Sequence, residues 1–284
     1  RAFYTEPFAE YIEKLSKISD FESVLPMNTG AEAVETAIKA ARRWGYFTKG
    51  IEKDCAEIIV AEGNFHGRTT TIVGFSSEEE YKKGFGPFAS GFIEAEYCRT
   101  NCHCSKVCEK SITSIKNAIN KNTCAVIVEP IQGEGGIITP QSGWLMQLRD
   151  LCNENNVLLI LDEIQSGLGR TGKLFAFEHE GIKPDGLILG KALGGGLLPV
   201  SAFLSSKEVM NHFNPGSHGS TFGGNPLAAR VASKALDLLF EDNLIENSKV
   251  MGLYLKTQLS EMNHNFIKEI RGKGLWIGVE LDSG

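Results

Sequence analysis

The sequence has 284 residues, of which 42% are hydrophobic and 23% charged, a composition that is ordinary for a globular protein. Its 29 basic and 35 acidic residues give a formal net charge of −6, which gives no support to binding of nucleic acid or of an anionic membrane surface. The apolar runs are far shorter than the roughly 20 residues that span a bilayer, so we expect no membrane span. No signal peptide is visible, and because both ends look cut, a lost targeting segment stays open.

Apolar runs in chain order predict seven strands, at 23–27, 57–62, 92–97, 125–130, 157–164, 186–190 and 200–205. Several runs are continuously apolar, as is typical of strands that are buried on both faces. Amphipathic helical patterns follow some of the strands, at 31–47, 111–119 and 144–155. This alternation predicts an α/β domain with a mostly parallel sheet flanked by helices, which we assign to residues 1–245.

The remainder of the sequence predicts a different organisation. Two amphipathic helices are expected at 225–243 and 244–262, and a last strand at 274–281. We therefore interpret residues 246–284 as a connecting helix and the beginning of a small C-terminal domain.

The predicted strands end in chemically active residues. Asp162 ends one strand, Lys191 follows another, and Gly30 and Ala31 open the helix after the first. Functional groups of such sheets gather at the carboxyl ends of the strands. A glycine at a helix start can accommodate a phosphate on the backbone N–H groups, and a second polar loop at 216–226 offers the Ser220 and Thr221 hydroxyls.

A lysine, a carboxylate and a phosphate cradle together indicate pyridoxal 5′-phosphate. Lys191 would form a Schiff base with the aldehyde of this cofactor, and Asp162 would keep its pyridine nitrogen protonated. Each residue has an ordinary alternative, because Lys191 could be a surface lysine in a loop and Asp162 a helix cap. The combination favours the cofactor.

Seven cysteines divide into two groups. Cys55, Cys124 and Cys152 lie in apolar or helical contexts and are interpreted as buried free thiols, which suits a reducing compartment. The other four lie close together in YCRTNCHCSKVCEKS, at Cys98, Cys102, Cys104 and Cys108, with His103 among them. Zinc or an iron–sulfur cluster is one interpretation of this segment. Because the spacing does not match the usual pairs, we favour a surface insertion without metal.

Longer motifs resemble one family. LDEIQSGLGRTGK, LGKALGGG and HGSTFGGNPLA resemble the class III aminotransferases of pyridoxal-phosphate fold type I. VLPMNTGAEAVETAIKAARRWGY, GNFHGRT, EPIQGEGG and NPGSHGSTFGGNPLA are similar to the ornithine δ-aminotransferase branch, particularly its bacterial form. The resemblance covers nearly the whole sequence except about residues 97–112. Compared with that family, we expect an N-terminal segment and most of the small C-terminal domain to be missing from this sequence.

The resemblance implies cofactor-binding roles for residues that match the family. Lys191 would carry the cofactor and move a proton during the reaction, with Asp162 on the pyridine nitrogen. Gln165 would bind the ring oxygen, and Phe65 and Ile164 would cover the two faces of the ring.

The same resemblance implies how the phosphate is bound. Gly30 and Ala31 would bind it, and Thr221, beside Ser220, would reach it from the neighbouring subunit of a homodimer.

Substrate-binding roles follow in the same way. Arg68 would bind the α-carboxylate of L-ornithine. Glu134 would act as a gate that neutralises a second arginine, expected in the missing C-terminal part, when ornithine is bound and releases it for 2-oxoglutarate. Glu129 would support the site from its strand end. His66 replaces a tryptophan of some animal members, and we expect no change of chemistry from it.

The implied activity is cytoplasmic transfer of the ornithine δ-amine to 2-oxoglutarate, in the mitochondrial matrix if the source is eukaryotic. Two alternatives stay open. One is a related class III enzyme acting on N-acetylornithine, 4-aminobutyrate or the lysine ε-amine, and the other is a catalytically incomplete fragment.

Overall fold

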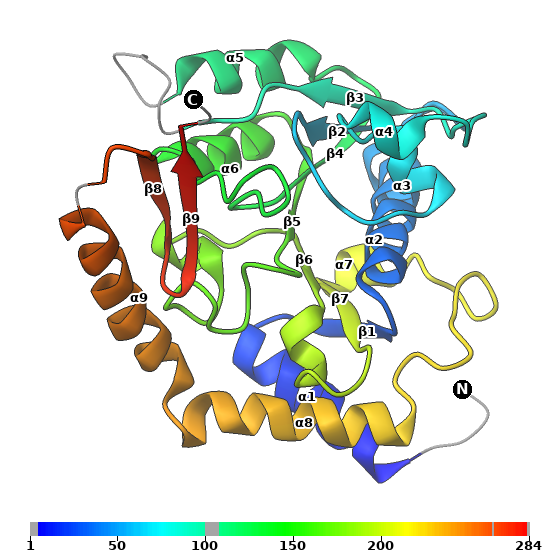
Figure 1. Cartoon of the computed structure of the whole chain (residues 1–284). Helices are drawn as coiled ribbons and strands as arrows, with labels where there is room; N and C mark the ends of the chain where they lie inside the picture. The colour runs from blue at the N-terminus through cyan, green and yellow to red at the C-terminus, as the bar shows by residue number, and fades with distance from the viewer. Residues whose placement is uncertain (1–4, 100–107, 263, 283–284) are drawn as a thin grey trace.

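The computed structural model describes residues 5–99, 108–262 and 264–282. Seven strands of this part form one sheet in the order β1-β7-β6-β5-β4-β2-β3 (Figure 1). They are β1 (Ser23–Met27), β2 (Glu57–Ala61), β3 (Phe92–Ala95), β4 (Thr123–Val128), β5 (Leu158–Asp162), β6 (Gly186–Leu189) and β7 (Ser201–Ser205). The predicted strands coincide with these to within a few residues, and the mostly parallel α/β sheet is confirmed.

Strand β7 is the exception to the parallel arrangement. It runs antiparallel to both neighbours, pairing Ser201 with Met27 of β1 and Ala202 with Leu189 of β6. Two reversals restore the direction, so β1 and β6 end at the same edge of the sheet. Strand β5 is parallel to β6 and ends there too, with Asp162 in register with Ile188. The residues that follow these three strands are therefore brought together.

Helices cover both faces of the sheet. The α-helices of the described residues are α1 (Glu6–Ser19), α2 (Gly30–Trp44), α3 (Thr70–Gly74), α4 (Glu79–Lys82), α5 (Glu109–Ala118), α6 (Trp144–Glu154), α7 (Lys207–Met210), α8 (Pro226–Glu241) and α9 (Leu244–Glu261). A π-helix, η1 (Gly45–Lys49), and two 3-10 helices, η2 (Ala176–His179) and η3 (Lys191–Gly194), complete the set. Helix α1 lies outside the predicted elements.

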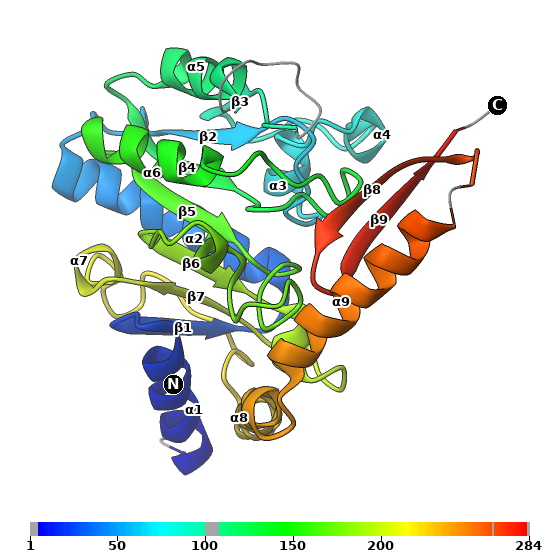
Figure 2. The ribbon, with the colours of Figure 1, turned by 90° about the vertical axis from the view of Figure 1, so that its left-hand side faces the viewer.

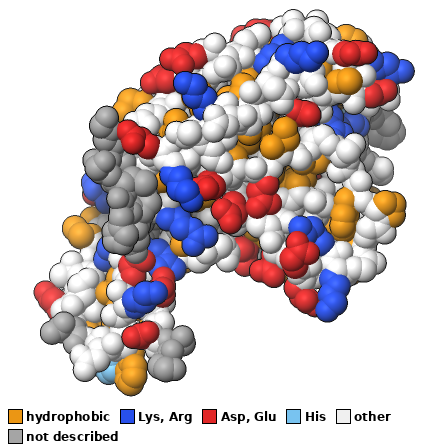
Figure 3. Space-filling view, turned by 90° about the horizontal axis from the view of Figure 1, so that it is seen from above, with side chains coloured by type: hydrophobic (Ala, Val, Ile, Leu, Met, Phe, Trp, Pro, Cys, Tyr) orange, Lys and Arg blue, Asp and Glu red, His pale blue; other side chains and the backbone are white. Residues whose placement is uncertain are grey.

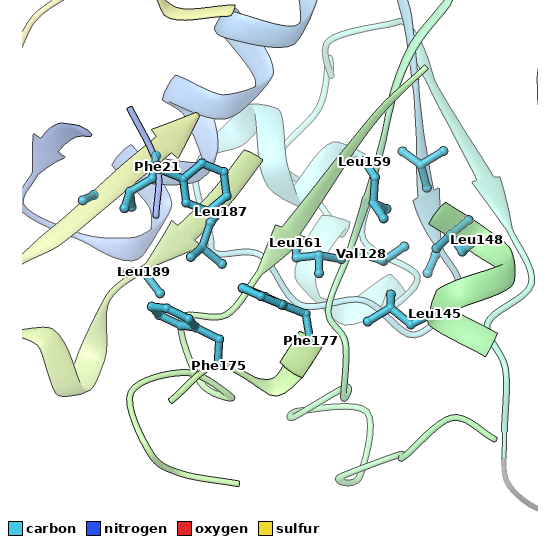
Figure 4. Close-up of a cluster of buried hydrophobic side chains, with 14 of the residues drawn as sticks. Phe21, Val128, Leu145, Leu148, Leu159, Leu161, Phe175, Phe177, Leu187 and Leu189 are labelled. Atoms are coloured by element: carbon cyan, nitrogen blue, oxygen red, sulfur yellow. The ribbon is translucent and has the colours of Figure 1, made fainter. Parts of the chain in front are cut away.

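The continuous apolar runs supply two cores, one on each face. On β5, Ile160 packs with α2 and its neighbours, whereas Leu159 and Leu161 pack on the other face. Figure 4 shows Leu159 and Leu161 in the same cluster as Leu145 and Leu148 of α6. Burying one such side chain contributes about 1.5–3 kcal/mol, so a strand buried on both faces holds its end residues firmly in place.

A separate hairpin follows α9. Strands β8 (Ile267–Lys273) and β9 (Trp276–Leu281) pair antiparallel with each other, and Figure 2 shows this hairpin projecting from the main sheet beside α9. Strand β9 was predicted, whereas β8 lies outside the predicted elements. The division of the chain at residue 246 remains a prediction.

The molecular surface carries charges of both signs. Figure 3 shows acidic and basic side chains interspersed over the face seen from above. Within the described ranges, no helix is long and apolar enough to cross a membrane.

Cys124 and Cys152 are buried free thiols, and burial raises the pKa of each to about 12. The expectation of burial is wrong for Cys55, which is only partly buried. Cys102, His103 and Cys104 lie outside the described residues.

Candidate active site

A cavity of about 190 Å³ lies at the sheet edge where β1, β5 and β6 end. It contains the predicted amine, carboxylate and helix start together with the two predicted ring-covering side chains. Its lining residues are Gly30, Ala31, Phe65, His66, Gly67, Glu129, Asp162, Ile164, Gln165 and Lys191. Predicted cofactor residues from widely separated segments are thus brought together in one place.

Lys191 enters the cavity from a strained backbone. Its φ angle is 41°, a left-handed conformation that is uncommon outside glycine. Such strain tends to concentrate at functional sites. Burial lowers the pKa of the Lys191 amine, while the charges of Glu134, Asp162 and Glu129 oppose this effect. A lowered pKa increases the share of the neutral, nucleophilic amine near neutral pH.

Asp162 is buried, and each of its two carboxylate oxygens has a hydrogen-bond partner. Its Oδ2 lies 2.7 Å from Nδ1 of His66, and its Oδ1 accepts a hydrogen bond from the Ile164 amide at 3.0 Å. Burial opposes a charge on His66, but the hydrogen bond and the charges of Asp162 and Glu129 outweigh it and raise the pKa of this imidazole. Asp162 is thereby fixed next to the His66 ring, in the lining of the cavity.

Glu129 links two loops around the cavity. Its two carboxylate oxygens accept hydrogen bonds from the Phe65 amide at 3.0 Å and the Gly133 amide at 3.1 Å. Burial raises the pKa of Glu129 to about 7, against the opposing charge of His66 and these two amides. The expected supporting role at a strand end therefore has a concrete geometry.

Two glycines allow close approach at the helix start. A Cβ on Gly30 would lie 2.8 Å from Cδ1 of Ile164, and one on Gly67 would lie 2.9 Å from the Ala31 Cβ. Gly67 also has a φ of 131°, which side chains rarely tolerate. Any larger residue would push these segments apart and change the width of the cavity.

The predicted substrate residues lie around the cavity rather than in its lining. Arg68 is exposed, with its guanidinium carbon 4.1 Å from the centre of the Tyr81 ring and 5.8 Å from that of Phe65. Glu134 is exposed and acts on Lys191 through its charge. Tyr81, which the motifs did not single out, thus contributes to where Arg68 stands.

The second polar loop does not line this cavity. The Ser220 hydroxyl accepts a hydrogen bond from the Asn28 side chain at 3.0 Å, so it stands beside the start of α2. Thr221 is exposed. Its contact with a neighbouring subunit stays a prediction.

A larger recess of about 550 Å³ lies at the opposite edge of the sheet. Its walls include Arg149 and Asp185, which form an ion pair at 2.7 Å, and Lys183 and Asp20, paired at 2.6 Å. These four charged side chains pair with one another. The smaller cavity contains Lys191, whose pKa is lowered, and is therefore the stronger candidate for an active site.

The chemistry of the cavity fits a flat aromatic aldehyde that bears an anionic group. It offers an amine, a buried carboxylate, apolar side chains from Phe65 and Ile164, and the N-terminus of the 15-residue helix α2. A helix N-terminus favours anions because its N–H groups are unpaired and its dipole is positive.

Comparison with known proteins places these residues in context. The family model of the class III aminotransferases matches residues 1–284. Ornithine aminotransferase of Brevibacillus brevis is 54% identical over 281 residues, which are 99% of this chain and 67% of that protein. The chain thus spans about two thirds of the length of such relatives.

Solved structures are similar as well. Ornithine aminotransferase from Toxoplasma gondii, with pyridoxal phosphate at partial occupancy in its active site, has a TM-score of 0.94 and 41% identity, and the match covers all of this chain and 65% of that one. Acetylornithine aminotransferase from Elizabethkingia anophelis has a TM-score of 0.84 and 40% identity, covering 100% and 66% of the two chains.

Proposed function

The chain belongs to the class III aminotransferases, which use pyridoxal 5′-phosphate, and from this premise we propose that it transfers the δ-amino group of L-ornithine to 2-oxoglutarate. The observation that carries the proposal is the identity of 54% with an ornithine aminotransferase over 99% of this chain. The products are glutamate 5-semialdehyde and glutamate.

The cavity residues divide the work of holding the cofactor. Lys191 would bind it covalently, Asp162 would hold the proton on the pyridine nitrogen, and Gln165 would hydrogen-bond the ring oxygen. Gly30 and Ala31 would bind the phosphate at the start of α2. When bound, pyridoxal phosphate supplies an aldehyde that accepts an amine and a ring that takes up the electrons of a broken C–H bond.

Phe65 and Ile164 would exclude water from the two faces of the ring. Their positions follow from hydrogen bonds, because the Phe65 amide is bound by Glu129 and the Ile164 amide by Asp162. Glu129 and Asp162 therefore supply carboxylates to the site and also fix the backbone that carries the two ring-covering side chains.

Lys191 would also carry the proton that moves between the two carbons of the reacting group. Its amine would serve in this role when it is not bound to the cofactor. Burial, which lowers the pKa of the Lys191 amine, suits it to accept a proton near neutral pH.

Arg68 would determine which amine of ornithine reacts. Its exposed guanidinium stands beside the cavity and can bind a carboxylate with two parallel hydrogen bonds. With the α-carboxylate bound there, the length of the molecule would bring the δ-amine to Lys191. Glu134 would neutralise a second arginine while ornithine is bound and would release that arginine when 2-oxoglutarate binds.

The same proposal includes a homodimer in the cytoplasm. Thr221 would donate to the phosphate of the partner's site, and Ser220 would support it from the same loop. The exposure of Thr221 outside the cavity of its own chain is consistent with this arrangement.

Product analysis tests the substrate. Protein loaded with pyridoxal phosphate would be incubated with 2-oxoglutarate and ornithine, N-acetylornithine, 4-aminobutyrate or lysine. We expect ornithine to be the best donor and its product to cyclise to pyrroline-5-carboxylate. Faster reaction of N-acetylornithine would favour the alternative that the similarity to the Elizabethkingia anophelis enzyme supports. Loss of visible absorbance on borohydride reduction, without turnover of any donor, would indicate an incomplete fragment that still binds the cofactor.

A further inference from the structure

One side chain of the C-terminal hairpin contacts the loop that carries Glu134. Arg271, on β8, donates from its Nε to the carbonyl oxygen of Gly136 at 2.7 Å. Arg271 and Gly136 are 135 residues apart in the sequence. The contact therefore joins the hairpin to the edge of the active site.

The loop of residues 132–138 is a compact turn. Gln132 and Ile138 exchange backbone hydrogen bonds at 3.0 and 2.9 Å, and the amides of Gly136 and Ile137 both donate to the Gly133 carbonyl at 3.0 Å. Glu134 lies near its tip. A turn closed by its own hydrogen bonds moves as a unit, so a hold on Gly136 is also a hold on Glu134.

The loop is held from two sides. On the cavity side, Glu129 accepts from the Gly133 amide, and a Cβ on Gly133 would lie only 2.6 Å from the Gln165 side chain. On the outer side, the hold comes from Arg271, and β9 approaches closely there, since a Cβ on Gly278 would lie 3.3 Å from the Gly136 oxygen.

Arg271 is itself fixed. Its Nη1 donates to Glu269 at 3.0 Å and to Glu280 at 2.6 Å, and its side chain is only 12% exposed. The planar guanidinium binds these carboxylates and the carbonyl in different directions at once, which a lysine ammonium cannot reproduce with the same geometry. A displacement of the hairpin would therefore displace the loop through Arg271.

We propose that Arg271 is a positioning residue that, through the Gly136 carbonyl, holds the loop of residues 132–138 so that the carboxylate of Glu134 faces the amine of Lys191. The consequence is that the hairpin controls the charge around the amine that binds the cofactor. The inference rests on the proposed function in taking Lys191 as the cofactor-binding amine.

Glu134 is the carboxylate whose effect on Lys191 depends on this hold. Three carboxylates act on the Lys191 amine, namely Glu134, Asp162 and Glu129. Asp162 and Glu129 are buried at strand ends and bound by His66 and by backbone amides. Glu134 is exposed on the loop, so a displaced loop changes its distance from the amine directly, whereas Asp162 keeps its contact with His66 and Glu129 its bond from the Phe65 amide.

The test follows the titration of Lys191 in protein freed of cofactor. The rate at which pyridoxal phosphate forms its visible, borohydride-reducible complex would be measured across pH for wild type, Arg271→Met, Glu134→Gln and the double variant. We expect both single variants to move the midpoint of the profile to lower pH by about 0.5 unit, which is a threefold change in the neutral amine. The double variant is expected to show no further shift, since both changes remove the same interaction.

The sign of the shift separates positioning from a direct charge effect. Removing the positive charge of Arg271 would by itself raise the pKa of a nearby amine, whereas withdrawal of Glu134 lowers it. Lys268→Met is the matched control, because it breaks an exposed ion pair with Glu280 on the same hairpin and is expected to leave the midpoint unchanged. If Arg271→Met does not fold, Arg271→Lys replaces it, with a smaller shift of the same sign expected.

Two results would overturn the inference. One is a wild-type midpoint in the Arg271 variants accompanied by a lower melting temperature, which would make Arg271 purely structural. The other is a double variant whose shift is the sum of the single shifts. Because the measurement requires no transamination, failure of the ornithine assay would remove the proposed function without deciding the role of Arg271.

Discussion

Lys191 experiences two opposing influences at the level of a single side chain. Burial disfavours its charged form, and three carboxylates favour it. Its left-handed backbone, with φ at 41°, follows directly on Gly190, where a Cβ would lie 3.2 Å from Cγ2 of Ile164. The Lys191 amine therefore reaches the cavity from a strained backbone, with tight packing at the preceding glycine.

We expect Lys191→Ala to abolish transamination and the visible cofactor band while the fold remains. Nucleophilic catalysis depends on one amine at one position, and alanine removes it without adding bulk. Absorbance before and after borohydride reduction, together with circular dichroism, checks both parts. A variant that kept a reducible chromophore would show that another lysine binds the cofactor.

Arg68 allows a prediction about substrate length. Arg68→Lys should weaken kcat/KM for ornithine by about 1.5–3 kcal/mol, the scale of a hydrogen bond to a charged group. A simple ω-amine without the carboxylate should lose much less. Equal losses for the two substrates would mean that Arg68 supports Phe65 and Tyr81, over whose rings its guanidinium lies, rather than the substrate.

At the scale of elements, the turn after β5 is organised by a second buried carboxylate. Glu163 accepts hydrogen bonds from the amides of Ala176 at 2.6 Å and Phe177 at 2.9 Å. It therefore ties the start of the turn that carries Ile164 and Gln165 to the segment at η2. Sequence motifs draw attention to Asp162, but it is this neighbour that fixes the turn.

Glu163 makes stability depend on pH in a defined direction. Burial raises the pKa of this carboxyl from 4.5 to about 8, so the folded chain retains a proton that the unfolded chain has lost. The free energy of unfolding should therefore fall as pH rises from about 4.5 to about 8.

We expect Glu163→Gln to flatten this dependence by up to about 1.4 kcal/mol per pH unit. Urea unfolding of cofactor-free protein at several pH values measures it. The variant will also be less stable at low pH, because its amide group meets a backbone donor, but the slope is the diagnostic quantity. Glu154→Gln, which changes an exposed carboxylate at the end of α6, is the control. Parallel curves for wild type and Glu163→Gln would contradict the assignment.

Elements with strong local patterns could be predicted from the sequence. The runs that became β4, β5 and β6 are apolar because both their faces are buried, and their end residues were therefore expected to share an edge. The antiparallel direction of β7 was not predictable in this way, since its sequence is equally apolar in either direction.

Contacts between distant segments escaped prediction for a related reason. That His66 leaves the chemistry unchanged stays a prediction, but its contact with Asp162, which lies 96 residues away, was not anticipated. Tyr81, which meets Phe65 edge-on and lies below the Arg68 guanidinium, was not singled out as a site residue. His66 directly follows Phe65 in the motif GNFHGRT. Its titratable ring was the one local signal that could have suggested a link to a strand-end carboxylate.

At the scale of the whole molecule, exposed apolar side chains indicate a further contact surface. Leu197, Phe222 and Leu227 are exposed by 78%, 68% and 65%; Leu197 lies shortly after η3, and the other two lie in or next to the loop of residues 216–226. Exposed apolar groups of this size are typical of protein interfaces when they gather in one area. They agree with the proposed dimer, in which the loop containing Thr221 would cross to the partner.

A mixing experiment tests whether the site is shared between subunits. Thr221→Ala alone should weaken binding of pyridoxal phosphate by about 1.5–3 kcal/mol, through loss of one hydrogen bond to a charged group. Lys191→Ala alone removes covalent binding. If Thr221 serves the partner, a mixed dimer contains one cavity with both defects and one cavity with none, because symmetric dimers exchange the same elements.

Combining the two variants by co-refolding should therefore restore normal affinity and turnover in one cavity of each mixed dimer, which form roughly half of the dimers at equal input. Mixing each variant with itself is the control and restores nothing. If Thr221 instead acts within its own chain, every cavity in the mixture retains one defect and no recovery occurs. A chain that sediments as a monomer and still binds pyridoxal phosphate tightly would contradict the shared site directly.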